Sequence, residues 1–228
     1  MQNSEKTFKN HLFRMIGVAL FCALAYIAML LIHFPVSFLT LDPKDAIITL
    51  CGLCFGPVSA LVSSFAVSLL EMITVSSTGP YGLLMNFMGT AAFSVTVSFI
   101  YRWRKNLAGA ILGLVSGVFA MTAVMLALNL LIIPLYMPGA TVSAVKSMIP
   151  TLLLPFNLVK AVFNAAIVLL LYKPVSAALQ RIGFLPKSTA KLRFGTRTIL
   201  VTIAAILLIV ASLFVIFQVL GGSFRFGV

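Results

Sequence analysis

Long runs of apolar residues with very few charges inside them dominate this chain. Of its 228 residues, 61% are hydrophobic and only 9% are charged, whereas soluble domains carry about 25% charged residues. A chain with so little charge cannot cover a surface that faces water, so lipid must be its solvent. Since a membrane-crossing helix needs about 20 apolar residues, the sequence predicts an all-α, polytopic transmembrane bundle. The expected helices span 15–33, 45–55, 58–74, 83–101, 108–133, 150–172 and 198–220.

The segment 45–74 could form one long crossing or two short helices that turn at Gly56-Pro57. Proline ends a helix, and a preceding glycine permits a sharp turn. With a turn there, twelve of the sixteen basic residues lie on one face of the membrane, which the positive-inside rule assigns to the cytoplasm. A single crossing would place two of the three large basic clusters outside. We therefore predict two helices and a cytoplasmic N-terminus.

The predicted outer loops are 34–44, 75–82 and 134–149, and they are rich in proline. The helix at 45–55 is short for a full crossing, and short helices at bilayer depth are tolerated where they line a protein cavity. On the inner face, 173–197 reads as a basic linker to the last helix, 198–220, which we expect to face lipid.

The formal net charge of +12 would suggest nucleic acid in a soluble protein. Here the basic residues sit in short clusters between apolar runs, which indicates contact with membrane lipid and not with nucleic acid. The chain lacks a phosphate-binding GxxxxGK[ST] loop. With four acidic residues and two histidines, it offers no convincing metal cluster or nucleophile–base pair. We therefore expect neither an enzyme nor a bound metal or cofactor.

Polar residues at membrane depth are costly and mark candidate sites. Lys160 lies about 15 Å below the outer end of its helix by helical rise, which is deep for a lysine that merely reaches the surface. Asn157, three residues earlier, shares its helix face. Asn129 near the outer end of 108–133 could contact a ligand or form an interhelical hydrogen bond. Asp45 suits an N-cap of the helix 45–55, but its cluster also faces the outer half of the bundle.

Five motifs occur in order at matching helix spacing and together resemble the riboflavin-specific S components of energy-coupling factor (ECF) transporters over about residues 10–187. They are Leu41-Asp-Pro-Lys-Asp-Ala, Phe55-Gly-Pro, Met85-Asn-Phe-Met-Gly-Thr, Asn129 with Pro134-Leu-Tyr-Met, and Pro155-Phe-Asn-Leu-Val-Lys160. The resemblance implies a bacterial plasma-membrane protein with a six-helix substrate-binding domain, 1–187. The segment 188–228 then adds a basic linker and a seventh crossing.

The resemblance also implies ligand and partners. Riboflavin would be the transported cargo, bound through its isoalloxazine or ribityl groups by Asn129, Asn157 and Lys160, with Thr40 and Asp45 near the mouth. A transmembrane coupling protein and two cytoplasmic ATPases would be the partners, and the small residues Ala19 and Ala23 would contact the coupling protein. The residues leave two alternatives open, an S component for another vitamin and a self-sufficient secondary transporter.

Overall fold

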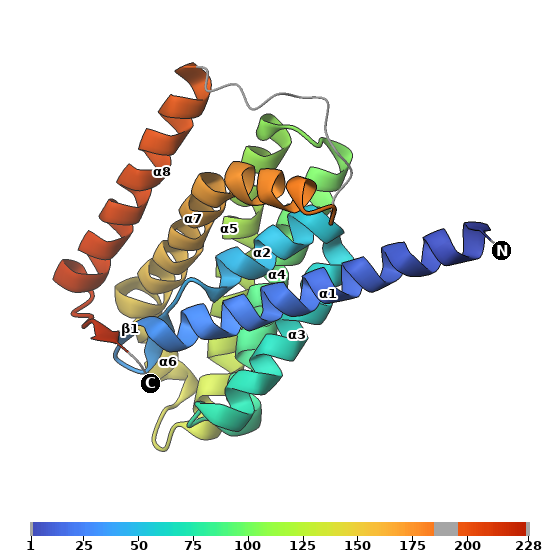
Figure 1. Ribbon diagram of the computed structural model, residues 1–228. Coiled ribbons are helices and arrows are strands. Elements are labelled where there is room, and N and C mark those ends of the chain that lie inside the picture. The colour runs from blue at the N-terminus through green and yellow to red at the C-terminus, as the bar shows by residue number, and fades with distance from the viewer. Residues whose placement is uncertain (1, 185–195, 227–228) are drawn as a thin grey trace.

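The computed structural model describes residues 2–184 and 196–226 and confirms the all-α bundle (Figure 1). Within this part of the chain, six helical segments are long and apolar enough to cross a membrane. A shorter helix, α2, completes the core. The long helices are α1 (Gln2–Leu31), α3 (Pro57–Thr74), α4 (Gly79–Trp103), α5 (Leu107–Tyr136), α7 (Leu154–Arg181) and α8 (Thr196–Phe214), and α2 spans Lys44–Phe55.

The predicted turn between the second and third helices is confirmed. Helix α2 ends at Phe55, and Gly56 adopts a φ of 96°, in the region that favours glycine. Pro57 occupies the first turn of α3, where its missing N–H costs no helical hydrogen bond. The chain therefore reverses at Gly56, between α2 and α3.

The outer segment 34–44, expected to be a loop, contains a β-hairpin. Strand β1 (Ile32–Val36) pairs antiparallel with β2 (Leu39–Leu41), with Phe34 opposite Leu41. Ser37 at the turn has a φ of 55°. The alternation of buried and exposed residues along the strands gives the hairpin one face that packs against the bundle.

Two further expectations about the loops were wrong. The outer segment 134–149 contains α6 (Val142–Met148), whose N-cap Thr141 accepts a hydrogen bond from the amide of Ala144 at 3.2 Å. A π-helical turn, η1 (Ile149–Leu153), joins it to α7. On the inner side α7 continues through Pro174 to Arg181, so the predicted end at residue 172 was too early. The proposed domain boundary at 187/188 lies outside the described residues.

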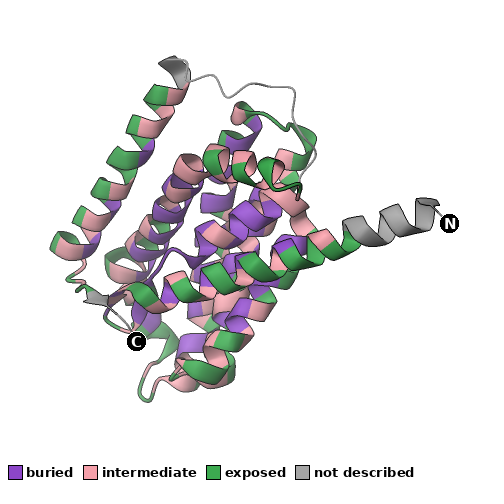
Figure 2. Cartoon of the chain, viewed as in Figure 1, coloured by how far each residue is buried: buried purple, intermediate pink, exposed green. Residues whose placement is uncertain are grey.

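Helices α4 and α5 pack closely because glycines face the neighbouring helix. A Cβ at Gly113 would lie 2.9 Å from the carbonyl oxygen of Val97, and one at Gly117 would lie 2.6 Å from a methyl group of Val97. Close backbone approach of this kind is typical of membrane helices. Buried residues are concentrated in the centre of the bundle, whereas α1 and α8 expose long apolar faces (Figure 2).

Helix α8 was expected to face lipid, and most of its surface is exposed. One edge, however, packs along α7. Its end continues as the π-helical turn η2 (Val215–Val219) and a short strand β3 (Arg225–Phe226). Strand β3 pairs antiparallel with β1, so the end of the chain lies beside the outer hairpin (Figure 1). This pairing was not predicted from the sequence.

Candidate substrate-binding site

A cavity of about 270 Å³ lies among the hairpin and the outer halves of the helices. The hairpin and the start of α2 supply Thr40, Asp42 and Asp45, and α7 supplies Asn157 and Lys160. Polar residues at the end of α3, in the turn after it and on α4 line the cavity as well. Aromatic and methionine side chains form most of its apolar wall, which suits an organic ligand with a flat apolar part. These wall residues are Met29, Phe38, Met85, Met121, Met125, Tyr136 and Phe156.

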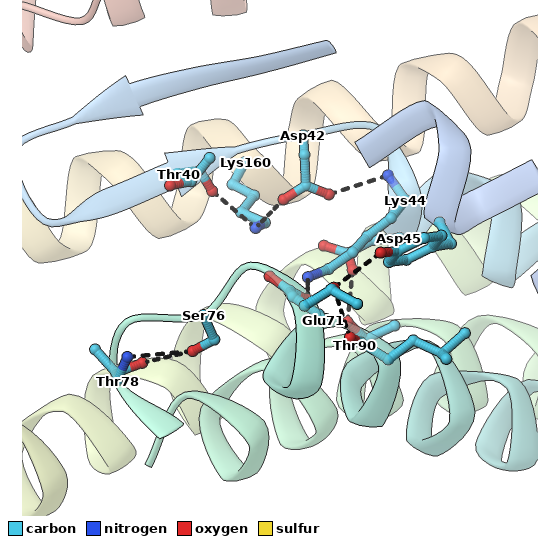
Figure 3. Close-up of polar contacts among 12 residues, drawn as sticks. Thr40, Asp42, Lys44, Asp45, Glu71, Ser76, Thr78, Thr90 and Lys160 are labelled. Carbon is cyan, nitrogen blue, oxygen red and sulfur yellow. Dashed lines mark hydrogen bonds and ion pairs between the residues drawn. The ribbon is translucent and has the colours of Figure 1, made fainter. Parts of the chain in front are cut away.

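Lys160 ties α7 to the hairpin (Figure 3). Its ammonium donates to the backbone oxygen of Thr40 at 2.9 Å and to Oδ2 of Asp42 at 3.0 Å. Both side chains are nearly buried, with 10% and 3% of their surface exposed. The carboxylate and the carbonyl offset the cost of burying the Lys160 ammonium. Removal of the Lys160 or the Asp42 side chain would leave the other charge buried and unpaired.

Asn164, one turn further along α7, also binds the backbone at the start of α2. Its Oδ1 accepts a hydrogen bond from the amide of Ala46 at 2.8 Å. Its Nδ2 donates to the backbone oxygens of Asp42 and Lys160, each at 3.0 Å. The side chain therefore satisfies an otherwise free amide in the first turn of α2 as well as the carbonyl just before that helix.

The predicted N-cap role of Asp45 was wrong. Pro43 occupies the cap position, and it is Asp42 whose Oδ1 accepts a hydrogen bond from the Lys44 amide at 3.1 Å. Asp45 lies inside the first turn, where its Oδ1 accepts from Oγ1 of Thr90 on α4 at 2.6 Å. Its Oδ2 is buried without a hydrogen-bond partner among the described residues. An unmet acceptor on the wall of a cavity is suited to a ligand donor.

A second ion pair joins Lys44 to Glu71, at the end of α3. The Lys44 side chain has only 2% of its surface exposed, so Glu71 supplies the charge that this burial requires. Together the two pairs fix the hairpin and α2 to α3 and α7 (Figure 3).

Among the residues that the structure describes, the cavity lining contains no lysine or arginine other than Lys160. Lys160 is the one ammonium group in its lining, and that group is already paired with Asp42. Burial acts to raise the pKa of Asp42, but the nearby ammonium groups of Lys160 and Lys44 outweigh it, so the pKa lies below its ordinary value. Asp42 therefore stays ionised and remains in an ion pair with Lys160.

Four of the five predicted ligand residues, Thr40, Asp45, Asn157 and Lys160, line the cavity. Nδ2 of Asn157 donates to the backbone oxygen of Leu153 at 2.7 Å. Asn129 does not line it; the residue is fully buried and both side-chain polar atoms lack partners among the described residues.

Asn129 nevertheless lies on α5 between two residues that line the cavity. Met125 lies one turn before it on α5 and Tyr136 two turns after it, and both line the cavity. Ala19 and Ala23 are exposed on α1, one turn apart. Two polar partners that hold the site, Thr90 and Asn164, are not among the predicted site residues, although Asn164 lies four residues from Lys160 and so shares its helix face.

The sequence and structure comparisons define the class of protein. The family model of the substrate-specific component of ECF transporters matches residues 13–172. A solved structure described as the S component of a bacterial ECF transporter superposes with a TM-score of 0.61 at 29% identity, over 79% of this chain and 100% of that chain. The chain therefore belongs to the substrate-specific components of ECF transporters and is a multi-pass membrane subunit of a transporter.

Two curated relatives are riboflavin transporters. The chain is 30% identical over 178 residues to riboflavin transporter RibU of Staphylococcus aureus (strain TCH60), which covers 74% of this chain and 93% of that protein. It is 26% identical over 171 residues to riboflavin transporter FmnP of Bacillus subtilis (strain 168), which covers 70% of this chain and 90% of that protein.

Proposed function

We propose that the chain captures riboflavin from outside the cell and delivers it inward when docked on the other ECF subunits. The observation that carries the choice of ligand is the similarity to riboflavin transporter RibU of Staphylococcus aureus, at 30% identity over nearly the whole of that protein. This function is binding and transport without chemical turnover of the ligand.

The chemistry of the cavity supports a neutral ligand with a flat aromatic ring. Methionine and aromatic side chains form most of the apolar wall, and polar groups come from the hairpin, the start of α2, α7, the end of α3 with the turn after it, and α4. A ligand with a carboxylate or a phosphate would need a free cation, but Lys160 is paired with Asp42. Riboflavin carries no net charge and offers imide and hydroxyl hydrogen-bond donors, one of which could meet the free Oδ2 of Asp45.

We propose Thr40, Asp45, Asn157 and Lys160 as contacts of the ligand, because all four line the cavity. Asn129 is proposed as a fifth, because its unpartnered amide lies between two residues that line the cavity, Met125 and Tyr136. Lys160 has a double role in this account, since it also holds the hairpin through Asp42 and the Thr40 carbonyl.

The same charges weigh against an S component for an acidic vitamin and against a secondary transporter. An S component for biotin or a pantothenate-like acid would place a carboxylate beside the Asp42 and Asp45 carboxyl groups. A self-sufficient secondary transporter usually carries ion-coupling carboxylates near the midplane, whereas the carboxylates described here pair with Lys44 and Lys160 at the outer end or bind Thr90.

Purified, ligand-free protein should quench riboflavin fluorescence stoichiometrically. Asn157→Ala and Lys160→Ala should each weaken binding by about tenfold or more, equivalent to about 1.4 kcal/mol or more. Arg181→Ala, at the exposed last residue of the same helix, is the control and should bind like the wild type. FMN, biotin and thiamine, titrated in parallel, should bind more weakly. Folded wild-type protein that binds one of these and not riboflavin would refute the choice of ligand.

We also propose that the subunit docks on a transmembrane coupling protein bound to two cytoplasmic ATPases. Ala19 and Ala23 are exposed one turn apart on α1, and small residues at this spacing allow a partner helix to approach closely. In this mechanism the hairpin closes over the loaded cavity and the whole subunit reorients against its partner to release the ligand inward.

The docking proposal predicts that Ala19→Trp and Ala23→Trp abolish co-purification with the coupling protein, because the indole holds the partner helix away. Riboflavin binding by these isolated variants should be unchanged. Ala204→Trp, at an exposed position of α8, provides a matched control and should co-purify normally. Normal co-purification of both α1 variants would place the contact elsewhere.

We propose a plasma-membrane location with the N-terminus in the cytoplasm, supported by the basic clusters at the inner ends of the helices. Single cysteines test it once Cys22, Cys51 and Cys54 are replaced by serine. An impermeant maleimide should label Ser143→Cys on intact cells, and Arg104→Cys only after the membrane is opened. The reverse pattern would invert the topology.

A further inference from the structure

The outer hairpin is held on two sides by different parts of the chain. From the cavity side, Asp42 and the Thr40 carbonyl bind Lys160. From the other side, the end of the chain packs against β1. The contacting residues there are Ile216, Phe217, Gly222, Ser223 and Phe224, which we term the C-terminal brace.

Aromatic contacts form the centre of this packing. The ring of Phe34 on β1 lies edge-on to Phe217, with centroids 5.6 Å apart, and tilted against Phe224 at 5.4 Å. On the bundle side the same ring meets Phe163 of α7 at 6.4 Å. Phe34 is thus enclosed between α7 and the C-terminal brace and has only 7% of its surface exposed.

Backbone contacts fix the position of the brace. The amide of Ser223 donates to the carbonyl of Pro35 at 3.1 Å. Gly222 packs so closely that a Cβ there would lie 3.0 Å from a methyl group of Val36 and 2.7 Å from Ile216. Val36 and Ile216 are both completely buried. The brace therefore clamps β1 along its length, beyond what the aromatic rings alone would achieve.

The clamped hairpin carries part of the binding site. His33 of β1, Phe38 at the turn and Thr40 of β2 all line the cavity. The two strands pair in register, so a displacement of β1 must move β2 and its lining residues. The brace lies beyond residue 172, where the match to the family ends, and it is a feature of this chain that the family model does not cover.

We infer that Phe217 and the Ser223 amide are positioning residues that hold the hairpin closed over the cavity and so lengthen the time for which the ligand stays bound. This inference rests on the proposed function of the cavity. A ligand leaves only when the hairpin moves, and the brace opposes that movement from a site that the ligand does not touch. The kinetic effect of losing it falls mainly on dissociation.

The full-length protein, loaded with riboflavin, tests this. A large dilution prevents rebinding, and the return of riboflavin fluorescence gives the dissociation rate. Phe217→Ala and Ser223→Pro should each release riboflavin about tenfold faster, equivalent to about 1.4 kcal/mol. Phe217→Tyr, which keeps the ring, should restore the slow rate. Phe214→Ala removes an identical side chain that is 62% exposed on α8 and should dissociate like the wild type.

Binding stoichiometry separates this role from loss of folded protein, because misfolding lowers the bound fraction and leaves the rate of the remainder unchanged. Ser223→Pro provides an independent variant if Phe217→Ala does not fold. Should wild-type protein bind riboflavin and both variants release it at the Phe214→Ala rate, the brace has no positioning role. Should wild-type protein bind no riboflavin at all, the proposed function fails and this inference falls with it.

Discussion

The ion pair between Lys160 and Asp42 is the interaction on which the outer half of this protein depends. It joins residues 118 positions apart and fixes the segment before α2 to the second turn of α7. Because both groups are almost fully buried, neither can lose the other without a large penalty. Asn164 reinforces the junction by binding the backbone on both sides of it. The short helix α2 and the hairpin therefore have defined positions although neither crosses the membrane independently.

The character of the cavity follows from this pairing. Since Lys160 and Lys44 are each committed to a carboxylate, the polar side of the cavity offers hydrogen bonds and no free cation. Apolar walls of methionine and aromatic side chains complete a site suited to a neutral, flat molecule. Such a ligand can be bound without a net charge having to be buried with it, and the hairpin that carries part of the site is also the element held by the C-terminal brace.

The features that depend on local sequence patterns were predicted correctly. Apolar runs gave the helices, Gly56-Pro57 gave the reversal, and the depth of Lys160 and Asn157 in an apolar run pointed to the site. Pairings over long sequence distances were not readable, so Asn164 and Thr90 were missed and Asp45 was given a local cap in place of its bond to α4. The helix expected at 150–172 was too short, because α7 passes through Pro174 to Arg181. The hairpin is held by packing from the far end of the chain, which no local pattern reveals.

A double-mutant cycle on Asp42 and Lys160 tests the central claim most directly. Unfolding free energies would be measured for wild type, Asp42→Asn, Lys160→Met and the double variant in detergent. Each single change should destabilise the protein by about 3 kcal/mol or more, because it leaves a buried charge unpaired. The double variant should cost clearly less than the sum of the two, with a coupling energy of about 1–3 kcal/mol. Strictly additive effects would show that the pair does not hold the hairpin to α7.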